Sequence, residues 1–179
     1  MKRLQDNVTI ITGGGKGIGF GLASAFAKEG SNLVITGRNE ARLLEAKKKL
    51  EEGYGVKVLA LVADGADEVK IKEVIAKTVD TFGKINTLIN NAQTSKSGLS
   101  LIEHTKEDFD LAINSGLYAT FFYMKEAFPY LKESKGSVIN FASGAGLFGK
   151  LDRASAPAPP AHTAPPGTGC GPRGCRCAA

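Results

Sequence analysis

The chain alternates short apolar runs with longer segments of mixed polarity. Five runs rich in β-branched residues are candidate strands, at residues 7–12, 32–36, 56–62, 85–90 and 137–141. Between them lie segments with helical periodicity, at about residues 17–29, 39–52, 66–82 and 106–133. Runs that are apolar on both faces, each followed by a helix, are typical of a parallel sheet covered on both sides. The pattern predicts an α/β fold with a doubly wound parallel sheet that stops after its fifth strand.

Two helical segments carry more detailed signals. In residues 39–52, Leu43, Leu44 and Leu50 predict an apolar stripe that faces the core, with the lysines facing solvent. Thr105, followed three residues later by Asp108, predicts a variant capping box at the start of the last helix.

The periodic pattern ends near residue 151. Residues 152–179 contain no apolar side chain larger than proline or cysteine, yet they hold six of the seven prolines. Such a segment buries too little apolar surface to offset its ordering entropy. We therefore predict a folded domain at residues 1–151 and a disordered Pro/Ala/Gly-rich tail at residues 152–179. The abrupt change in composition is typical of a wrong reading frame or a chimeric gene.

Composition and charge argue against several classes of partner. The net charge of +5 is modest and spread over amphipathic helices, so we expect no nucleic-acid partner. No apolar run approaches about 18 residues, so we expect no membrane span, and no signal peptide is evident. A body without cysteine suits a reducing compartment, which predicts a cytoplasmic location. The tail cysteines lack the paired spacing of zinc ligands, so we expect no metal site.

A glycine-rich loop, Thr12-Gly13-Gly14-Gly15-Lys16-Gly17-Ile18-Gly19, follows the first strand and opens the first helix. Gly13 permits a tight turn, and Gly19 permits close packing of helix on strand. The free N–H groups at the start of a helix then bind phosphate. A P-loop is excluded, because no Gly-Lys-Ser/Thr follows at the required spacing. The loop predicts a Rossmann-type dinucleotide site whose contacts include Gly13, Gly15, Lys16, Gly17, Ile18 and Gly19.

The end of the second strand indicates which dinucleotide binds. A carboxylate at this point binds the ribose 2′-hydroxyl of NAD, but this chain has none there. Arg38 instead offers a planar guanidinium suited to a 2′-phosphate, and Lys16 adds a second positive charge. The sequence therefore favours NADP(H), with NAD(H) as the second candidate. The alternative is that Arg38 simply begins the next helix.

Together these motifs resemble the short-chain dehydrogenase/reductase (SDR) family. Thr12–Gly19 matches the glycine motif of the family, and Asp64 matches the residue that contacts the adenine ring. Asn90-Asn91-Ala92 matches its Asn-Asn-Ala-Gly segment, with Gln93 in place of the glycine. The resemblance covers about 150 residues and implies the N-terminal part of such a protein, followed by an aberrant tail. It adds Asp64, Asn91 and Ala92 to the expected coenzyme contacts and suggests that Gln93 changes the loop geometry near the pocket.

The resemblance also implies an activity, hydride transfer between NADP(H) and a small carbonyl or alcohol substrate. Ser143 matches the serine that hydrogen-bonds the substrate oxygen, and Asn114 matches the asparagine of the proton relay. The catalytic tyrosine and lysine would fall at Ala156 and Pro160, and no Tyr-x-x-x-Lys exists in the sequence. We therefore expect an impaired oxidoreductase. A non-catalytic dinucleotide-binding protein and a truncated or frameshifted gene product are the alternatives.

The resemblance implies a homo-oligomer for intact members of the family, whose fifth helix often lies in a dimer interface. No counterpart of that helix is found in this sequence, so the oligomeric state is left open. The substrate is left open as well, because the residues that would shape its pocket follow the fifth strand.

Overall fold

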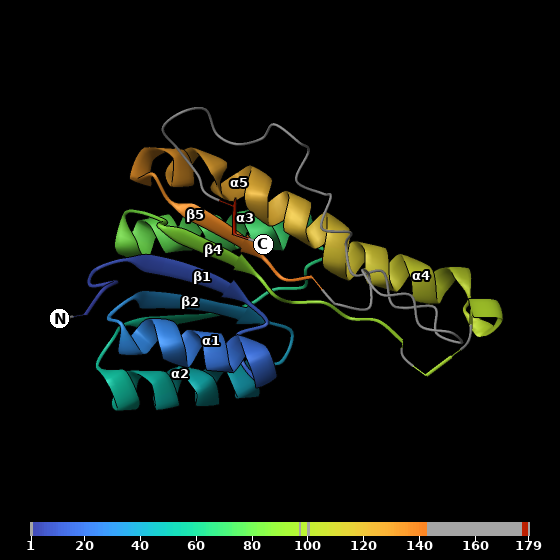
Figure 1. Ribbon diagram of the computed structural model, residues 1–179, viewed down its shortest axis with the longest axis horizontal. Coiled ribbons are helices and arrows are strands. Elements are labelled where there is room, and N and C mark those ends of the chain that lie inside the picture. The colour runs from blue at the N-terminus through green and yellow to red at the C-terminus, as the bar shows by residue number, and fades with distance from the viewer. Residues whose placement is uncertain (1, 97, 100, 143–176, 179) are drawn as a thin grey trace.

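A parallel β-sheet forms the centre of the molecule (Figure 1). The computed structural model describes residues 2–96, 98–99, 101–142 and 177–178. The strands are β1 (Val8–Thr12), β2 (Asn32–Gly37), β3 (Val58–Val62), β4 (Thr87–Asn90) and β5 (Ser137–Asn140). They pair in the order β3-β2-β1-β4-β5, and every pairing is parallel. The predicted doubly wound α/β fold is confirmed.

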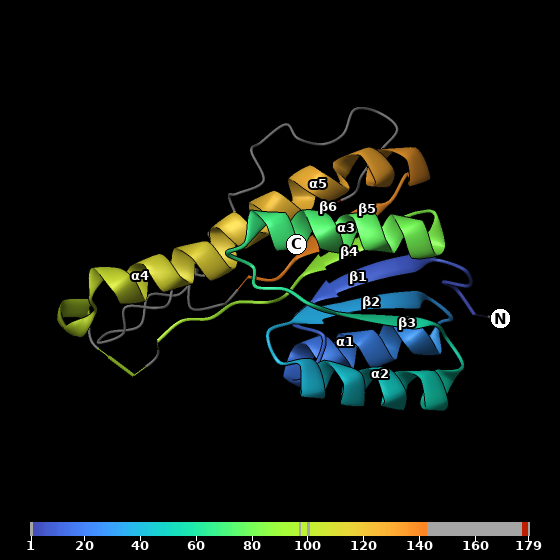
Figure 2. The ribbon, with the colours of Figure 1, turned by 180° about the vertical axis from the view of Figure 1, so that it is seen from behind.

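Helices cover both faces of this sheet. Helices α1 (Gly17–Lys28) and α2 (Glu40–Tyr54) lie on one face, and α3 (Glu68–Phe82) and α5 (Ala119–Ser134) lie on the other (Figures 1 and 2). The sheet is therefore buried on both sides, as its continuous apolar strands require. Within the described part of the chain, no helix is long and apolar enough to span a membrane.

The central strand β1 shows why the strands do not alternate between apolar, core-facing residues and polar, solvent-facing ones. All five of its residues are buried. Neighbouring side chains point to opposite faces of a sheet, so Ile10 packs with the side chains of α3 and α5, and Ile11 packs with those of α1 and α2. Each face thus has its own apolar core.

The predicted apolar stripe of α2 needs one correction. Leu43 and Leu50 are buried together with Ala46, but Leu44 is 53% exposed. Successive residues of an α-helix are turned by about 100° from each other, so Leu43 and Leu44 cannot both face the core squarely. The prediction was wrong for Leu44, and the stripe follows Leu43, Ala46 and Leu50.

The last predicted helix is divided into three parts. Helix α4 (Lys106–Ala112) passes into a π-helical segment, η2 (Ile113–Tyr118), and then into α5. A short 3₁₀ turn, η1 (Leu101–Glu103), precedes it and was not predicted. The capping box is confirmed: the Asp108 N–H donates to Thr105 Oγ1 at 3.2 Å, and the Thr105 N–H donates to Asp108 Oδ2 at 3.3 Å. The helix therefore begins where the sequence predicted, but it is not a uniform α-helix.

Several large apolar side chains of this long helix are exposed. Phe109 of α4 and Phe121 and Phe128 of α5 are each at least half exposed. These three aromatic side chains therefore lie outside both apolar cores of the sheet.

A short segment of the tail lies beside the last strand. Cys177–Ala178 forms β6, which pairs in parallel with β5 through Val138 and Ile139. These two residues depart from the expectation of a tail without regular structure. The remainder of the tail lies outside the described residues, so the disordered tail and the boundary near residue 151 stay predictions.

Candidate functional site

A cleft of about 770 Å³ opens along the carboxyl ends of the strands. It lies where the strand order reverses, since β1 has β2 on one side and β4 on the other. Ligands of open α/β sheets bind at this point. The cleft is lined by all the predicted coenzyme contacts, namely Gly13, Gly15, Lys16, Gly17, Ile18, Gly19, Arg38, Asp64, Asn91 and Ala92. The fold therefore brings these residues together.

The glycine loop favours glycine at Gly13 because of its backbone conformation and at Gly19 because of a close backbone contact. Gly13 has a φ of 70°, in the left-handed region that favours glycine. A Cβ atom on Gly19 would lie 2.2 Å from the carbonyl oxygen of Gly13 and 2.8 Å from Nδ2 of Asn91. The start of α1 therefore packs directly on the backbone of the loop that precedes it.

The N-terminus of α1 differs from those of α2, α3 and α4. Side chains cap α2, α3 and α4, where Asn39, Asp67 and Thr105 each accept a backbone N–H. In the part of the chain that the structure describes, Lys16 gives α1 no such side-chain cap, and the first turn holds no acidic residue. The positive end of the helix dipole thus faces the cleft without a competing carboxylate. This arrangement suits a phosphate group.

Thr12, at the end of β1, joins the glycine loop to the loop after β4. Its Oγ1 accepts the backbone N–H groups of Asn91 and Ala92, both at 2.9 Å. The Asn91 side chain returns a hydrogen bond to the Thr12 carbonyl oxygen at 3.0 Å. Sequence reasoning gave Thr12 no role of its own. The signal in the sequence that could have identified Thr12 is a hydroxyl side chain at the carboxyl end of a buried strand.

Arg38 reaches across the cleft. Its Nη2 donates to Oγ1 of Thr94, on the loop after β4, at 3.1 Å. Thr94 is held in turn by Ser115 of the π-helical segment: the Thr94 N–H donates to Ser115 Oγ at 3.0 Å, and the Ser115 hydroxyl donates to the Thr94 carbonyl at 2.8 Å. Thr94 and Ser115 both line the cleft and were not predicted.

Gln93, which replaces the usual glycine of the family segment, packs beside the same π-helical segment. A Cβ atom on Gly116 would lie 3.6 Å from Cγ of Gln93. This is an ordinary van der Waals distance, so Gln93 and η2 are direct neighbours in the wall of the cleft.

Tyr123 is a buried side chain at the floor of the cleft. Its hydroxyl donates to Thr36 Oγ1, at the end of β2, at 3.3 Å. Burial raises the pKa of Tyr123 to about 12. The phenol therefore stays protonated and acts as a hydrogen-bond donor around neutral pH. Sequence reasoning also missed this residue, because its contact depends on how α5 packs on the sheet.

Of the two predicted catalytic residues, the structure describes only Asn114. Asn114 lies in the π-helical segment η2 and is exposed; its neighbour Ser115 lines the cleft, and Asn114 does not. Ser143 lies outside the described residues. The catalytic roles of Asn114 and Ser143 stay predictions.

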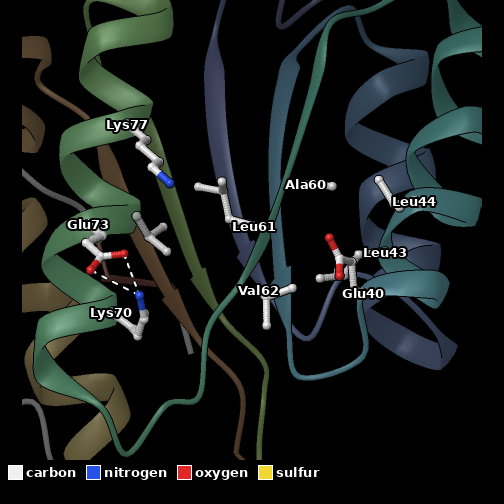
Figure 3. A pocket seen from close by; sticks show the side chains of 10 residues that line it. Glu40, Leu43, Leu44, Ala60, Leu61, Val62, Lys70, Glu73 and Lys77 are labelled. Carbon is white, nitrogen blue, oxygen red and sulfur yellow. Dashed lines mark hydrogen bonds and ion pairs between the residues drawn. The ribbon is translucent and has the colours of Figure 1, made fainter.

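A second, smaller hollow of about 270 Å³ lies at the β3 edge of the sheet. Figure 3 shows its side chains between α2 and α3, with the ion pair of Lys70 and Glu73 on one wall. Most of its other lining is aliphatic. Among the described residues, no group of three His, Cys, Asp or Glu side chains could hold a metal ion. The predicted chemistry is therefore concentrated in the larger cleft.

Comparison with known proteins agrees with the geometry of this cleft. The family model described as short chain dehydrogenase matches residues 7–155. The chain belongs to the short-chain dehydrogenase/reductase family. This confirms the family resemblance found in the sequence.

Individual relatives of this SDR chain cover most of its length. The 12alpha-hydroxysteroid dehydrogenase of a Clostridium species is 59% identical over 154 residues, which are 83% of this chain and 60% of that protein. Among solved structures, a short chain dehydrogenase from Burkholderia cenocepacia in complex with NADP has a TM-score of 0.81 and 29% identity, over 87% of this chain and 63% of its own. An NAD⁺-bound xylitol dehydrogenase has a TM-score of 0.80 and 26% identity, over 84% and 58%. The SDR chain thus spans about 60% of the length of the proteins that it matches.

Proposed function

We propose that the cleft binds NADP(H) in preference to NAD(H). The observation that carries this proposal is the position of Arg38 in the same cleft as the glycine loop and the uncapped end of α1. In the described residues around the end of β2, no carboxylate takes the place that would select an unphosphorylated ribose. A guanidinium binds phosphate through two parallel N–H bonds. Structural neighbours include both an NADP complex and an NAD⁺ complex, so the proposed preference depends on the residues at the end of β2 and not on these neighbours.

Titration calorimetry with NADPH and NADH tests the choice of coenzyme. We expect NADPH to bind more tightly, and Arg38→Leu to weaken NADPH binding by about 10- to 100-fold, the worth of charge-assisted hydrogen bonds. Binding of NADH should be unchanged. Lys48→Ala is the matched control, because it removes the same charge from the exposed face of α2, where Lys48 pairs with Glu52. Tighter binding of NADH than of NADPH would reverse the proposal.

The same chain is proposed to be the coenzyme-binding part of an oxidoreductase that acts on a hydroxyl or keto group. The 59% identity to a 12alpha-hydroxysteroid dehydrogenase favours a steroid substrate. When bound, the nicotinamide ring supplies or accepts hydride, and the protein must supply or accept a proton at the substrate oxygen. The tyrosine and lysine that do this in the family are absent from the sequence. We therefore propose that turnover is impaired by about 10²- to 10⁴-fold, the usual worth of general acid–base catalysis.

Incubation of the chain with NADPH and a 12-ketosteroid, followed by nicotinamide absorbance, tests this activity. Slow but measurable oxidation of NADPH is expected. Binding of NADPH with no turnover would instead favour a non-catalytic dinucleotide-binding protein. Turnover at ordinary enzyme rates would contradict the proposed impairment.

A further inference from the structure

We propose that Thr94 is a positioning residue that sets the selectivity of the cleft for NADP(H) by holding Arg38 over it. This inference rests on the proposed coenzyme choice and adds a residue to which neither the sequence motifs nor the comparisons assign a role. It starts from the hydrogen bond between Arg38 Nη2 and Thr94 Oγ1, which spans the cleft from the loop after β2 to the loop after β4.

Arg38 needs such a partner because its side chain is exposed. A free arginine side chain populates many rotamers, and restricting them costs conformational entropy whenever the guanidinium binds a ligand. The hydrogen bond to Thr94 restricts the side chain in advance. The guanidinium carries five N–H donors, so one bond to Thr94 leaves an edge free for a phosphate.

Thr94 can hold Arg38 in place because its own backbone is fixed. Its N–H and its carbonyl both pair with the Ser115 hydroxyl, at 3.0 Å and 2.8 Å. The Leu111 carbonyl, within the same long helix, lies 2.7 Å from Ser115 Oγ and is the alternative acceptor for its single proton. The Arg38–Thr94–Ser115 chain therefore ties the arginine to the π-helical segment η2 rather than to a free loop.

The hydroxyl of Thr94 should not affect the binding of NAD(H). NAD(H) has no 2′-phosphate, so it gains nothing from an ordered guanidinium. Loss of the hydroxyl should therefore weaken only the binding of NADP(H). A purely structural role for Thr94 would weaken the binding of both coenzymes together.

Thr94→Val tests the proposal, because valine has nearly the same shape and lacks the acceptor. NADPH affinity, measured by calorimetry on the full chain, should fall by about three- to ten-fold, the worth of one hydrogen bond, and NADH affinity should not change. Thr94→Ser keeps the hydroxyl and should restore NADPH binding. In an Arg38→Leu background, Thr94→Val should have no further effect on either coenzyme.

Three results would overturn the role of Thr94. These are an unchanged NADPH affinity, an equal loss for both coenzymes, or a gain in NADPH affinity, which would mean that Thr94 competes with the phosphate for Arg38. Thermal melts of each variant show whether the fold is retained. The proposed coenzyme choice fails separately, if Arg38→Leu alone leaves the preference between NADPH and NADH unchanged.

Discussion

A Cβ atom on Gly19 would lie 2.2 Å from the carbonyl oxygen of Gly13. Gly13 directly follows β1 and Gly19 lies in the first turn of α1, and their close contact lets the helix begin directly behind the strand. The N–H groups of α1 then open onto the cleft.

Replacing Gly19 with alanine should therefore damage both the fold and the site. Alanine would normally stabilise a helix by about 1 kcal/mol relative to glycine. Here the collision with the Gly13 backbone should instead lower the free energy of unfolding by about 1–3 kcal/mol. Coenzyme affinity should fall by about tenfold or more as the loop shifts. Denaturant unfolding and calorimetry measure the two effects.

Gly21→Ala is the control for this variant. Gly21 lies in the same helix, and apart from its chain neighbours and the helix's own backbone no described atom lies within 4 Å of the place its Cβ would take. This variant should be neutral or stabilising and should bind coenzyme normally. If the two variants behaved alike, the close approach of Gly19 to Gly13 would not be what constrains the loop.

Thr12→Val should destabilise the protein by removing the acceptor of two backbone N–H groups. Thr12 is buried, and its hydroxyl accepts from both Asn91 and Ala92. A valine of the same shape leaves these donors without an acceptor, which should cost about 1–3 kcal/mol in the free energy of unfolding. Urea unfolding measures the loss. Thr12→Ser keeps the hydroxyl and should recover most of the lost free energy of unfolding. If the serine variant were as unstable as the valine variant, the lost hydrogen bonds would not explain the effect.

The stability of the protein should fall at alkaline pH because of Tyr123. Burial holds the pKa of Tyr123 at about 12 in the folded protein, above the ordinary tyrosine value of 10.0. As pH rises, the unfolded chain loses this proton first, so the unfolded state gains relative stability between these two values. Well below pH 10, Tyr123 is protonated in both states and its contribution to the free energy of unfolding is fully present. By about pH 11 this contribution should have fallen by roughly 1.4 kcal/mol.

Tyr123→Phe isolates this contribution, since phenylalanine has no proton to lose. The difference in unfolding free energy between wild type and variant should be constant up to about pH 9 and should narrow or reverse by about pH 11. If the unfolding free energies of wild type and variant changed in parallel with pH over this range, Tyr123 would have the same pKa in the folded and unfolded states.

The cap of α3 provides a prediction that concerns the fold alone. The Asp67 carboxylate accepts the Lys70 N–H at 3.0 Å. Asp67→Ala should lower the free energy of unfolding by about 1 kcal/mol, as loss of an N-cap usually does. Asp80→Ala, near the other end of the same helix, should be neutral or slightly stabilising because it removes negative charge from the negative end of the dipole. Thermal unfolding measures both variants. If Asp80→Ala were less stable than Asp67→Ala, the capping role of Asp67 would be contradicted.

Much of this protein could be predicted from local rules. The apolar runs, the helical periodicity and the glycine loop each depend on residues close together in the chain, and they located the sheet, its covering helices and the end of α1 that opens onto the cleft. The capping box at Thr105 and Asp108 is equally local, and it was predicted correctly. Leu44 was misplaced because its direction depends on how α2 lies against the sheet.

The contacts that organise the cleft join residues far apart in the sequence. Arg38 and Thr94 are separated by 56 positions, and Tyr123 and Thr36 by 87. No local pattern identifies such partners, because a polar residue at the end of one strand has the same sequence signature whichever loop it faces. They meet because a parallel sheet brings the carboxyl ends of all its strands to one edge, and because α5 packs its tyrosine against that edge.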